Sequence, residues 1–284
     1  MLTHLVIEDA VRRALLEDCP TGDVTSEATI PADITGSVRL RAREDGVLAG
    51  IDVFTAAFRT VDPGIRVDAH ARDGERFAAG DVLAEVDGPV RGILTAERVA
   101  LNFTQRMCGI ATMTRRFVDA VDAATGSHAR ITDTRKTVPG LRPFDRHAVV
   151  CGGGHNHRYG LSDAVLVKDN HLAAMRAAGL DLAATLRHIR SQIGHTTHIE
   201  VEIDGLDQLG MALDGGADTI MFDNFTLQDT RRGVELVDGR ALVEASGTMT
   251  LDRAPAVAAC GVDLISVGAL THSVRAIDLG LDWR

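Results

Sequence analysis

Lys136 and Lys168 are the only lysines in a chain of 284 residues that contains 30 lysines and arginines together. They lie in two polar stretches, Thr134-Arg135-Lys136-Thr137 and Lys168-Asp169-Asn170-His171. A lysine ammonium is a compact point charge that can approach a phosphate or a reacting atom, whereas an arginine guanidinium is a flat, permanently charged fork. Two surface lysines could survive by chance in an arginine-biased composition. We expect instead that both lysines serve an anion-binding active site.

Further charged residues near the lysines indicate the kind of ligand. Arg135 and Arg158 add cations suited to carboxylates and phosphates, which indicates one strongly anionic ligand or two. Glu202 and Asp223 could hold Mg²⁺ beside a phosphate-bearing substrate or bind sugar hydroxyls. They could also be structural acids that only pair with the nearby cations.

Glycines and histidines add weaker signals. Backbone N–H groups at Gly152-Gly153-Gly154, Ser246-Gly247 and Gly268-Ala269 could bind phosphate oxygens. His155 and His157 lack the further ligands that zinc normally requires, so His157 beside Arg158 is better explained as a donor that orients a ligand.

Composition excludes several functional classes. A net charge of -10, without clustered arginines interleaved with aromatic residues, argues against a nucleic-acid partner. No apolar run approaches the length of a membrane span, and no apolar stretch precedes Glu8 and Asp9 that could serve as a signal peptide. The four cysteines are scattered, as is typical of a reducing compartment. We therefore expect a soluble, unprocessed, cytoplasmic protein.

The first part of the chain predicts an α+β domain. Apolar residues at helical spacing indicate helices near Leu5–Leu15 and Val53–Val61, and a long helix that begins at Thr95. Alternating residues or flanking turns indicate strands around 37–43, 65–69, 82–86 and 90–93.

The second part predicts a parallel sheet, because short apolar strands alternate with helical patterns. Polar residues follow nearly every strand, and the carboxyl ends of barrel strands converge on one face. An open doubly wound sheet would gather fewer of them at one point, so we favour a barrel. The expected strands are 129–132, 164–167, 199–203, 219–222, 242–245 and 264–267. We place the domain boundary between residues 110 and 111, with the extreme C-terminus able to pack back on the first domain.

Several motifs, in this order, closely resemble quinolinate phosphoribosyltransferase. The longest are Asp133-Thr134-Arg135-Lys136-Thr137-Val138-Pro139-Gly140, Gly152-Gly153-Gly154-His155-Asn156-His157-Arg158 and Val167-Lys168-Asp169-Asn170-His171. Shorter ones cover almost the whole chain: Gly22-Asp23-Val24-Thr25, Thr95-Ala96-Glu97-Arg98, Glu200-Val201-Glu202, Phe222-Asp223-Asn224-Phe225, Glu244-Ala245-Ser246-Gly247 and Gly268-Ala269-Leu270-Thr271-His272-Ser273.

The resemblance implies an α/β fold with an N-terminal α/β sandwich domain followed by an incomplete α/β barrel. It also implies a homodimer, or a higher even oligomer, in which Arg98 of the partner's N-terminal domain completes each site. Quinolinate would be bound by Arg98, Arg135, His157, Arg158 and Lys168, and Thr134 is a further expected substrate-binding residue. The 5-phosphoribosyl 1-pyrophosphate and its Mg²⁺ would be bound by Lys136, Lys168, Glu202 and Asp223, with Ser246, Gly247, Gly268, Ala269 and His272 around the 5-phosphate.

The implied reaction is phosphoribosyl transfer to quinolinate with loss of CO₂, which gives nicotinate mononucleotide in the biosynthesis of NAD. Lys136, Lys168, Glu202 and Asp223 are the expected catalytic residues, and Mg²⁺, held directly or through water by Glu202 and Asp223, is the expected cofactor. Two positions depart from the family pattern. Val150 replaces an arginine, and Thr248 replaces a glycine, where a β-branched residue would be strained if φ had to be positive.

Two other activities stay open. A related protein on the same scaffold, of the molybdenum-transport-associated type, would use another acceptor and need fewer carboxylate-binding arginines. A Schiff-base aldolase would use Lys168 as its nucleophile, although the adjacent Asp169 favours the ammonium form that cannot attack.

Overall fold

The computed structural model describes residues 2–124 and 126–284, and these form two compact units. The first unit contains the chain up to Arg115 together with Thr137–Gly153 and Ser273–Arg284. The second unit contains Arg116–Lys136 and Gly154–His272. Each unit therefore combines segments that are separated in the sequence.

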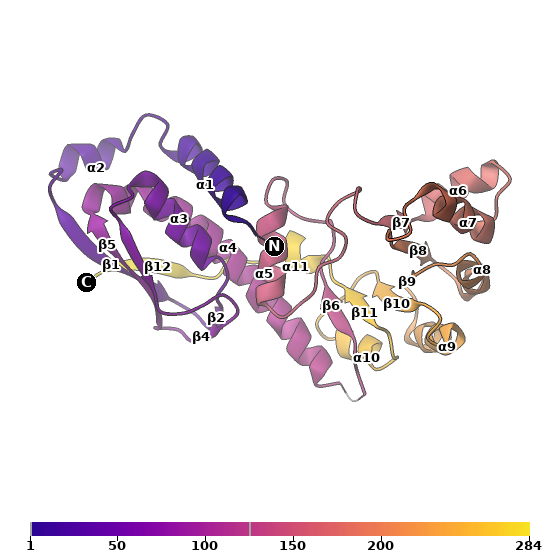
Figure 1. The fold of residues 1–284 in the computed structure, drawn as a ribbon. Coiled ribbons are helices and arrows are strands. Elements are labelled where there is room, and N and C mark those ends of the chain that lie inside the picture. Colours follow the sequence, from indigo (N-terminus) through magenta and orange to yellow (C-terminus); the bar gives the residue numbers. More distant parts are fainter. Residues whose placement is uncertain (1, 125) are drawn as a thin grey trace. The chain divides into compact units, whose positions relative to one another are not determined.

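The first unit is built around a four-stranded antiparallel sheet with the strand order β12-β1-β5-β3 (Figure 1). Val38, Leu40 and Ala42 alternate with more exposed residues along β1 and are buried, which is the period of a strand with one face on the core. The elements are α1 (His4–Asp18), α2 (Val24–Thr29), β1 (Thr35–Ala42), β2 (Gly46–Val47), α3 (Ile51–Val61), β3 (Arg66–Ala69), β4 (Arg76–Phe77), β5 (Val82–Pro89), α4 (Val90–Asp122, of which the part up to Arg115 belongs here), α5 (Arg142–Cys151) and β12 (Leu279–Trp283).

One predicted strand in this unit is wrong. Residues 90–93 form the first turn of α4 rather than a strand, so this helix begins five residues before the predicted start at Thr95. Val90, Ile93 and Ala96 are all buried and lie three residues apart, which is the spacing of one helix face. Because Pro89 already ends β5, the short apolar run after it starts the helix.

The second unit contains a six-stranded sheet with the order β6-β11-β10-β9-β8-β7. Every neighbouring pair in it is parallel. The predicted α/β class, with a sandwich-type first part and an incomplete parallel barrel, is confirmed. The elements are β6 (Arg130–Thr132), β7 (Val165–Val167), α6 (Asp169–Ala177), α7 (Leu182–Gln192), β8 (Ile199–Ile203), η1 (Leu206–Gln208), α8 (Leu209–Asp214), β9 (Thr219–Asp223), α9 (Leu227–Val237), β10 (Leu242–Ser246), α10 (Ala254–Ala258), β11 (Leu264–Ser266) and α11 (Ala269–His272).

The strand register brings the polar strand ends together. Asp223 at the end of β9 lies opposite Ser246 at the end of β10, and Ser266 of β11 lies opposite Thr132 of β6. Because all six strands run in the same direction, the residues that follow them collect at one edge of the sheet. This edge positions the candidate site. Among the described residues, no helix is long and apolar enough to cross a membrane.

Candidate active site

Lys136 lies in the loop that follows β6, and its backbone is fixed on both sides. Its amide donates to Thr134 Oγ1 at 3.1 Å, and its carbonyl accepts from Thr271 Oγ1 at 2.7 Å. The ammonium of Lys136 forms no ion pair with any residue that the structure describes. The chain therefore presents a well-anchored cation that is available to an anionic ligand.

Lys168 directly follows β7 and is the N-cap residue of α6. Its amide donates to His171 Nδ1 at 3.0 Å, which fixes the first turn of this helix. The ammonium forms an ion pair with Glu202 at the end of β8. A Schiff-base lysine requires desolvated surroundings that yield a free amine, so this salt bridge argues against the aldolase alternative.

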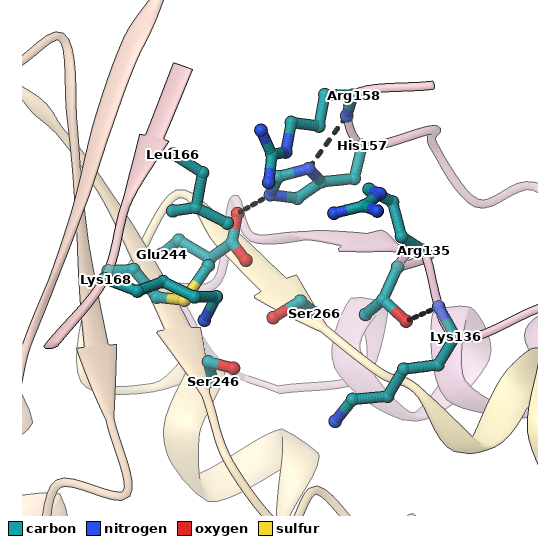
Figure 2. A pocket seen from close by; sticks show the side chains of 11 residues that line it. Arg135, Lys136, His157, Arg158, Leu166, Lys168, Glu244, Ser246 and Ser266 are labelled. Atoms are coloured by element: carbon teal, nitrogen blue, oxygen red, sulfur yellow. Dashed lines mark hydrogen bonds and ion pairs between the residues drawn. The ribbon is translucent and has the colours of Figure 1, made fainter. Parts of the chain in front are cut away.

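A first cavity of about 340 Å³ lies at the carboxyl edge of the sheet. Figure 2 shows Arg135, His157 and Arg158 grouped along one side of it, while Lys136 and Lys168 extend toward it from two other directions. Such a volume suits a small ligand. The lining residues are Thr134, Arg135, Lys136, His157, Arg158, Leu166, Lys168, Met221, Glu244, Ser246 and Ser266.

A second cavity of about 490 Å³ adjoins the first and shares Lys136, Lys168 and Ser246 with it. Its other lining residues are Glu202, Asp223, Asn224, Gly247, Thr248, Met249, Gly268, Ala269 and His272. The two shared lysines can therefore contact ligands in both cavities, as a reaction between two bound anions requires. Every predicted site residue except Arg98 lines at least one of the two cavities. Arg98 belongs to the first unit, where it is exposed on α4.

The loop between β10 and α10 has a close backbone contact with the end of β9. Gly247 has φ +113°, and a Cβ atom there would lie 2.2 Å from Asn224 Oδ1. Asn224 itself is left-handed, with φ 55°, and its Oδ1 accepts from the Thr248 amide at 3.3 Å. Among the described residues, Asn224 and Asp238 are the only non-glycine residues with positive φ, so the strain considered for Thr248 does not occur.

Gly268 provides a second close approach, after β11. A Cβ atom there would lie 3.1 Å from both Lys136 Cδ and His272 Nε2. The absence of a side chain therefore lets the stem of Lys136 and the ring of His272 pack directly against the backbone. This contact directs Lys136 into the second cavity.

Matches to protein-family models decide the family. The model described as the C-terminal domain of quinolinate phosphoribosyl transferase matches residues 110–282, and the model of the N-terminal domain matches residues 23–108. The chain belongs to the quinolinate phosphoribosyltransferase family. The resemblance carried by the sequence motifs is thereby confirmed.

Individual relatives support the same family over nearly the full length. The probable nicotinate-nucleotide pyrophosphorylase (carboxylating) of Bacillus subtilis is 40% identical, covering 99% of this chain and 94% of the relative. The nicotinate-nucleotide pyrophosphorylase (carboxylating) of Mycobacterium leprae is 44% identical and covers 96% of each chain. The crystal structure of NadC from Streptococcus pyogenes superposes with a TM-score of 0.94 at 36% identity, covering 100% of this chain and 99% of that one.

Sequence reasoning did not predict that buried acidic residues gather around His157 beside the first cavity. Glu200 and Glu244 approach His157 Nε2, with oxygens at 3.0 and 3.5 Å. Asp133, which is fully buried, accepts from the His157 amide at 2.8 Å. The available signal was the position of each glutamate between two apolar neighbours inside a strand, where a charged residue is rarely buried without a partner.

Proposed function

We propose that this chain transfers the phosphoribosyl group of 5-phosphoribosyl 1-pyrophosphate to quinolinate and releases pyrophosphate and CO₂. The product is nicotinate mononucleotide. The observation that carries the proposal is the pair of adjoining, cation-lined cavities that share Lys136 and Lys168 in a member of this family. Both substrates are multiply charged anions, so each needs several cations within contact distance.

The first cavity is suited to quinolinate. Arg135 and Arg158 can each bind a carboxylate through two parallel N–H···O bonds, and Lys168 contributes a point charge on the far side. Arg158 Nη1 donates to the Ala164 carbonyl at 3.0 Å, so part of its guanidinium is already held in place. Two separate carboxylate-binding groups favour a dicarboxylate over nicotinic acid, which has one carboxylate.

The second cavity is suited to the phosphoribosyl donor. Lys136 and Lys168 would face the pyrophosphate, while Ser246, Gly247, Gly268, Ala269 and His272 would surround the 5-phosphate. Backbone N–H groups in glycine-containing loops can approach phosphate oxygens closely because no side chain intervenes.

Catalysis would depend on stabilising the charges that develop in the transition state. The quinolinate nitrogen attacks the anomeric carbon with its lone pair, and the bond to pyrophosphate breaks with its electrons leaving on oxygen. Positive charge develops on the ribose, where the carboxylates of Glu202 and Asp223 would stabilise it. Lys136 would at the same time neutralise the charge that grows on pyrophosphate.

Decarboxylation would follow from the new bond. Once the ring nitrogen carries the ribose it is cationic and withdraws electrons from the neighbouring carbon. The bond to the adjacent carboxylate then breaks, CO₂ leaves, and the electron pair that stays on the ring carbon takes up a proton. No organic cofactor is needed for either step.

Mg²⁺ fits the acidic groups of the second cavity as a proposed cofactor. Glu202 and Asp223 are carboxylates at adjoining strand ends, which Mg²⁺ prefers together with phosphate oxygens and water. Glu202 already pairs with Lys168, and Asp223 Oδ2 accepts from Asn224 Nδ2 at 2.9 Å. Because these partners occupy part of each carboxylate, few protein oxygens remain for the ion. We therefore expect Mg²⁺ to contact Glu202 and Asp223 largely through water. When bound, the ion would neutralise charge on the pyrophosphate.

We further propose a cytoplasmic homodimer, or a higher even oligomer, in which Arg98 from one subunit reaches the first cavity of its partner. Arg98 lies outside the unit that contains every other predicted site residue, and it is exposed on α4. A cation delivered from a second subunit would complete a dicarboxylate site.

The direct test is a turnover assay with purified protein, Mg²⁺, 5-phosphoribosyl 1-pyrophosphate and either quinolinate or nicotinic acid. We expect pyrophosphate release with quinolinate and none above background with nicotinic acid. Turnover of nicotinic acid without turnover of quinolinate would refute the proposal.

A further inference from the structure

Both ring nitrogens of His157 contact groups of the protein itself. Nδ1 lies 2.8 Å from the Arg158 amide nitrogen and accepts its hydrogen, as Figure 2 shows. Nε2 lies 3.0 Å from an oxygen of Glu200 and 3.5 Å from an oxygen of Glu244. The side chain is only 12% exposed. His157 lines the first cavity, but protein groups already engage both of its nitrogens.

The two glutamates come from strands on either side of β9. Glu200 lies on β8 and is 5% exposed, and Glu244 lies on β10 and is 1% exposed. Oε1 of each has no hydrogen-bond partner among the described residues. Burying a carboxylate that is incompletely hydrogen-bonded is unfavourable, and an apolar side chain would fill the same space without that penalty. The two acids therefore need a functional explanation, and their shared contact is the Nε2–H of His157.

We propose that His157 is a positioning residue for quinolinate binding: Glu200 and Glu244 orient its ring, so that Nδ1 fixes the main chain of Arg158 and thereby places the guanidinium that binds a carboxylate. This inference rests on the proposed function for the identity of the ligand. It assigns His157 a different role from that of a donor to the substrate.

The contacts of the ring determine which nitrogen carries its hydrogen. Nδ1 can accept the Arg158 amide only while it carries no proton, so the ring hydrogen must be on Nε2, where the carboxylates accept it. The charged groups that face the ring are Glu200, Glu244 and the guanidinium of Arg158, while Asp133 holds the His157 backbone.

The acids also favour a proton on the ring. Burial lowers the pKa of His157, but the hydrogen bonds to Glu200 and Glu244 outweigh burial and raise that pKa. Burial, more than the charge of Glu244, raises the pKa of Glu200. The contacts of the two nitrogens place the ring hydrogen on Nε2, because Nδ1 accepts the Arg158 amide.

Two substitutions separate positioning from direct donation. His157→Gln can place an amide N–H near the position of Nε2 but offers no acceptor near Nδ1. The double variant His157→Asn with Glu200→Gln can place a carbonyl oxygen near the position of Nδ1, and the new glutamine can donate to Glu244. His157→Gln can therefore preserve the contact made by Nε2, and the double variant can preserve the contact made by Nδ1.

Steady-state kinetics distinguish the two possible roles of His157, positioning of Arg158 and direct donation to the substrate. We expect His157→Gln to raise KM for quinolinate by about 100-fold, the scale of a misplaced binding group, and to change KM for 5-phosphoribosyl 1-pyrophosphate by less than about 3-fold. We expect the double variant to recover at least about 10-fold of the lost affinity. If His157→Gln instead retains quinolinate affinity better than the double variant, His157 donates to the substrate and the proposal is wrong.

A second measurement does not depend on turnover. Nitrogen NMR of histidine-labelled protein, with His157 assigned by its loss in His157→Gln, reports whether each ring nitrogen carries a proton. We expect an unprotonated Nδ1 at neutral pH, and protons on both nitrogens would overturn the proposal. Failure of the wild-type protein to use quinolinate would refute the proposed function, and the NMR result would still decide the role of the ring.

Discussion

Lys136 and Lys168 line the same two cavities but have different partners. Lys168 is paired with Glu202, whereas Lys136 forms no ion pair with any residue in the described part of the chain. An unpaired ammonium keeps its full attraction for a developing negative charge. We therefore assign Lys136 to the departing pyrophosphate and Lys168 to a position between the two substrates.

Replacing Lys136 tests this assignment. We expect Lys136→Ala to lower kcat by about 100-fold to 1,000-fold, the usual effect of removing one group that stabilises transition-state charge. Lys136→Arg should restore only part of the rate, because a planar fork does not replace a point charge. Pyrophosphate release measures both, and Arg232→Ala is the matched control because it removes a cation from an exposed ion pair with Glu235. Equal rates in Lys136→Ala and the control would contradict the assignment.

Single residues show how far the sequence alone could predict this site. The rarity of lysine identified Lys136 and Lys168, and the strand-end positions identified Glu202 and Asp223, because both signals are local. The role of Glu200 and Glu244 could not be predicted in the same way. It depends on the approach of β8 and β10 to one histidine from a distant loop, which only the folded chain reveals.

At the scale of elements, the loop after β10 depends on glycine at one position. We expect Gly247→Ala to raise KM for 5-phosphoribosyl 1-pyrophosphate by about 10-fold or more, because φ of +113° strains an alanine by about 1–3 kcal/mol and the new Cβ would collide with Asn224 Oδ1. Gly239→Ala is the control, since Gly239 also has positive φ but a Cβ atom there would have no neighbouring atom within 4 Å. A similar rise in both variants would show that the collision has no role in binding.

The start of α3 in the first unit is held by an acid from another segment. Asp73 accepts from the amides of Gly50 and Ile51 at 3.0 Å each, and from His147 Nε2 at 2.7 Å. Burial alone would raise the pKa of Asp73, but these hydrogen bonds lower it below the usual value of 3.8. The stabilisation is therefore complete above that usual value and is lost as the pH falls through the lower value of the folded protein.

Urea unfolding of Asp73→Asn measures this contribution. We expect the variant to be less stable than the wild type by about 1–3 kcal/mol at pH 7, because it loses a charged acceptor for three donors. The difference should shrink as the pH falls below 3.8, because the carboxyl group of the unfolded chain then binds a proton more readily than the folded carboxylate, whose pKa is lower. A difference that does not change between pH 7 and pH 3.5 would show that the charge of Asp73 is not the cause.

Element boundaries were predictable where hydrophobic periodicity was unambiguous. The six strands of the parallel sheet lie within the predicted ranges or differ from them by one residue at an end. Residues 90–93 are an exception, because a run of four residues is too short to distinguish the period of a helix from the period of a strand. Only the continuation of buried positions through Ile93 and Ala96 identifies the helix.

At the scale of the whole molecule, the C-terminal residues return to the beginning of the chain. β12 pairs with β1, with Val38 opposite Trp283 and Leu40 opposite Leu281. A pairing across such a separation leaves little trace in local periodicity, so the sequence alone predicts only that the C-terminus can return to the first domain.

Mixed subunits test the proposed sharing of sites. If Arg98 acts in the partner's site, a dimer of one Arg98→Ala subunit and one Lys136→Ala subunit contains one intact site and one doubly defective site. We expect purified mixed dimers to show about half of the wild-type activity, while either variant alone is nearly inactive. Mixed dimers that stay as inactive as the parents would place Arg98 in the site of its own subunit.

We propose that two cation-lined cavities bring a dicarboxylate and a phosphoribosyl donor together for transfer with decarboxylation. The most direct measurement follows quinolinate labelled with isotopic carbon in the carboxylate beside the ring nitrogen, in the presence of 5-phosphoribosyl 1-pyrophosphate and Mg²⁺. We predict that labelled CO₂ and pyrophosphate appear in equal amounts and that nicotinate mononucleotide carries no label. Pyrophosphate release with the label retained in the nucleotide, or no reaction with quinolinate at all, would contradict the account.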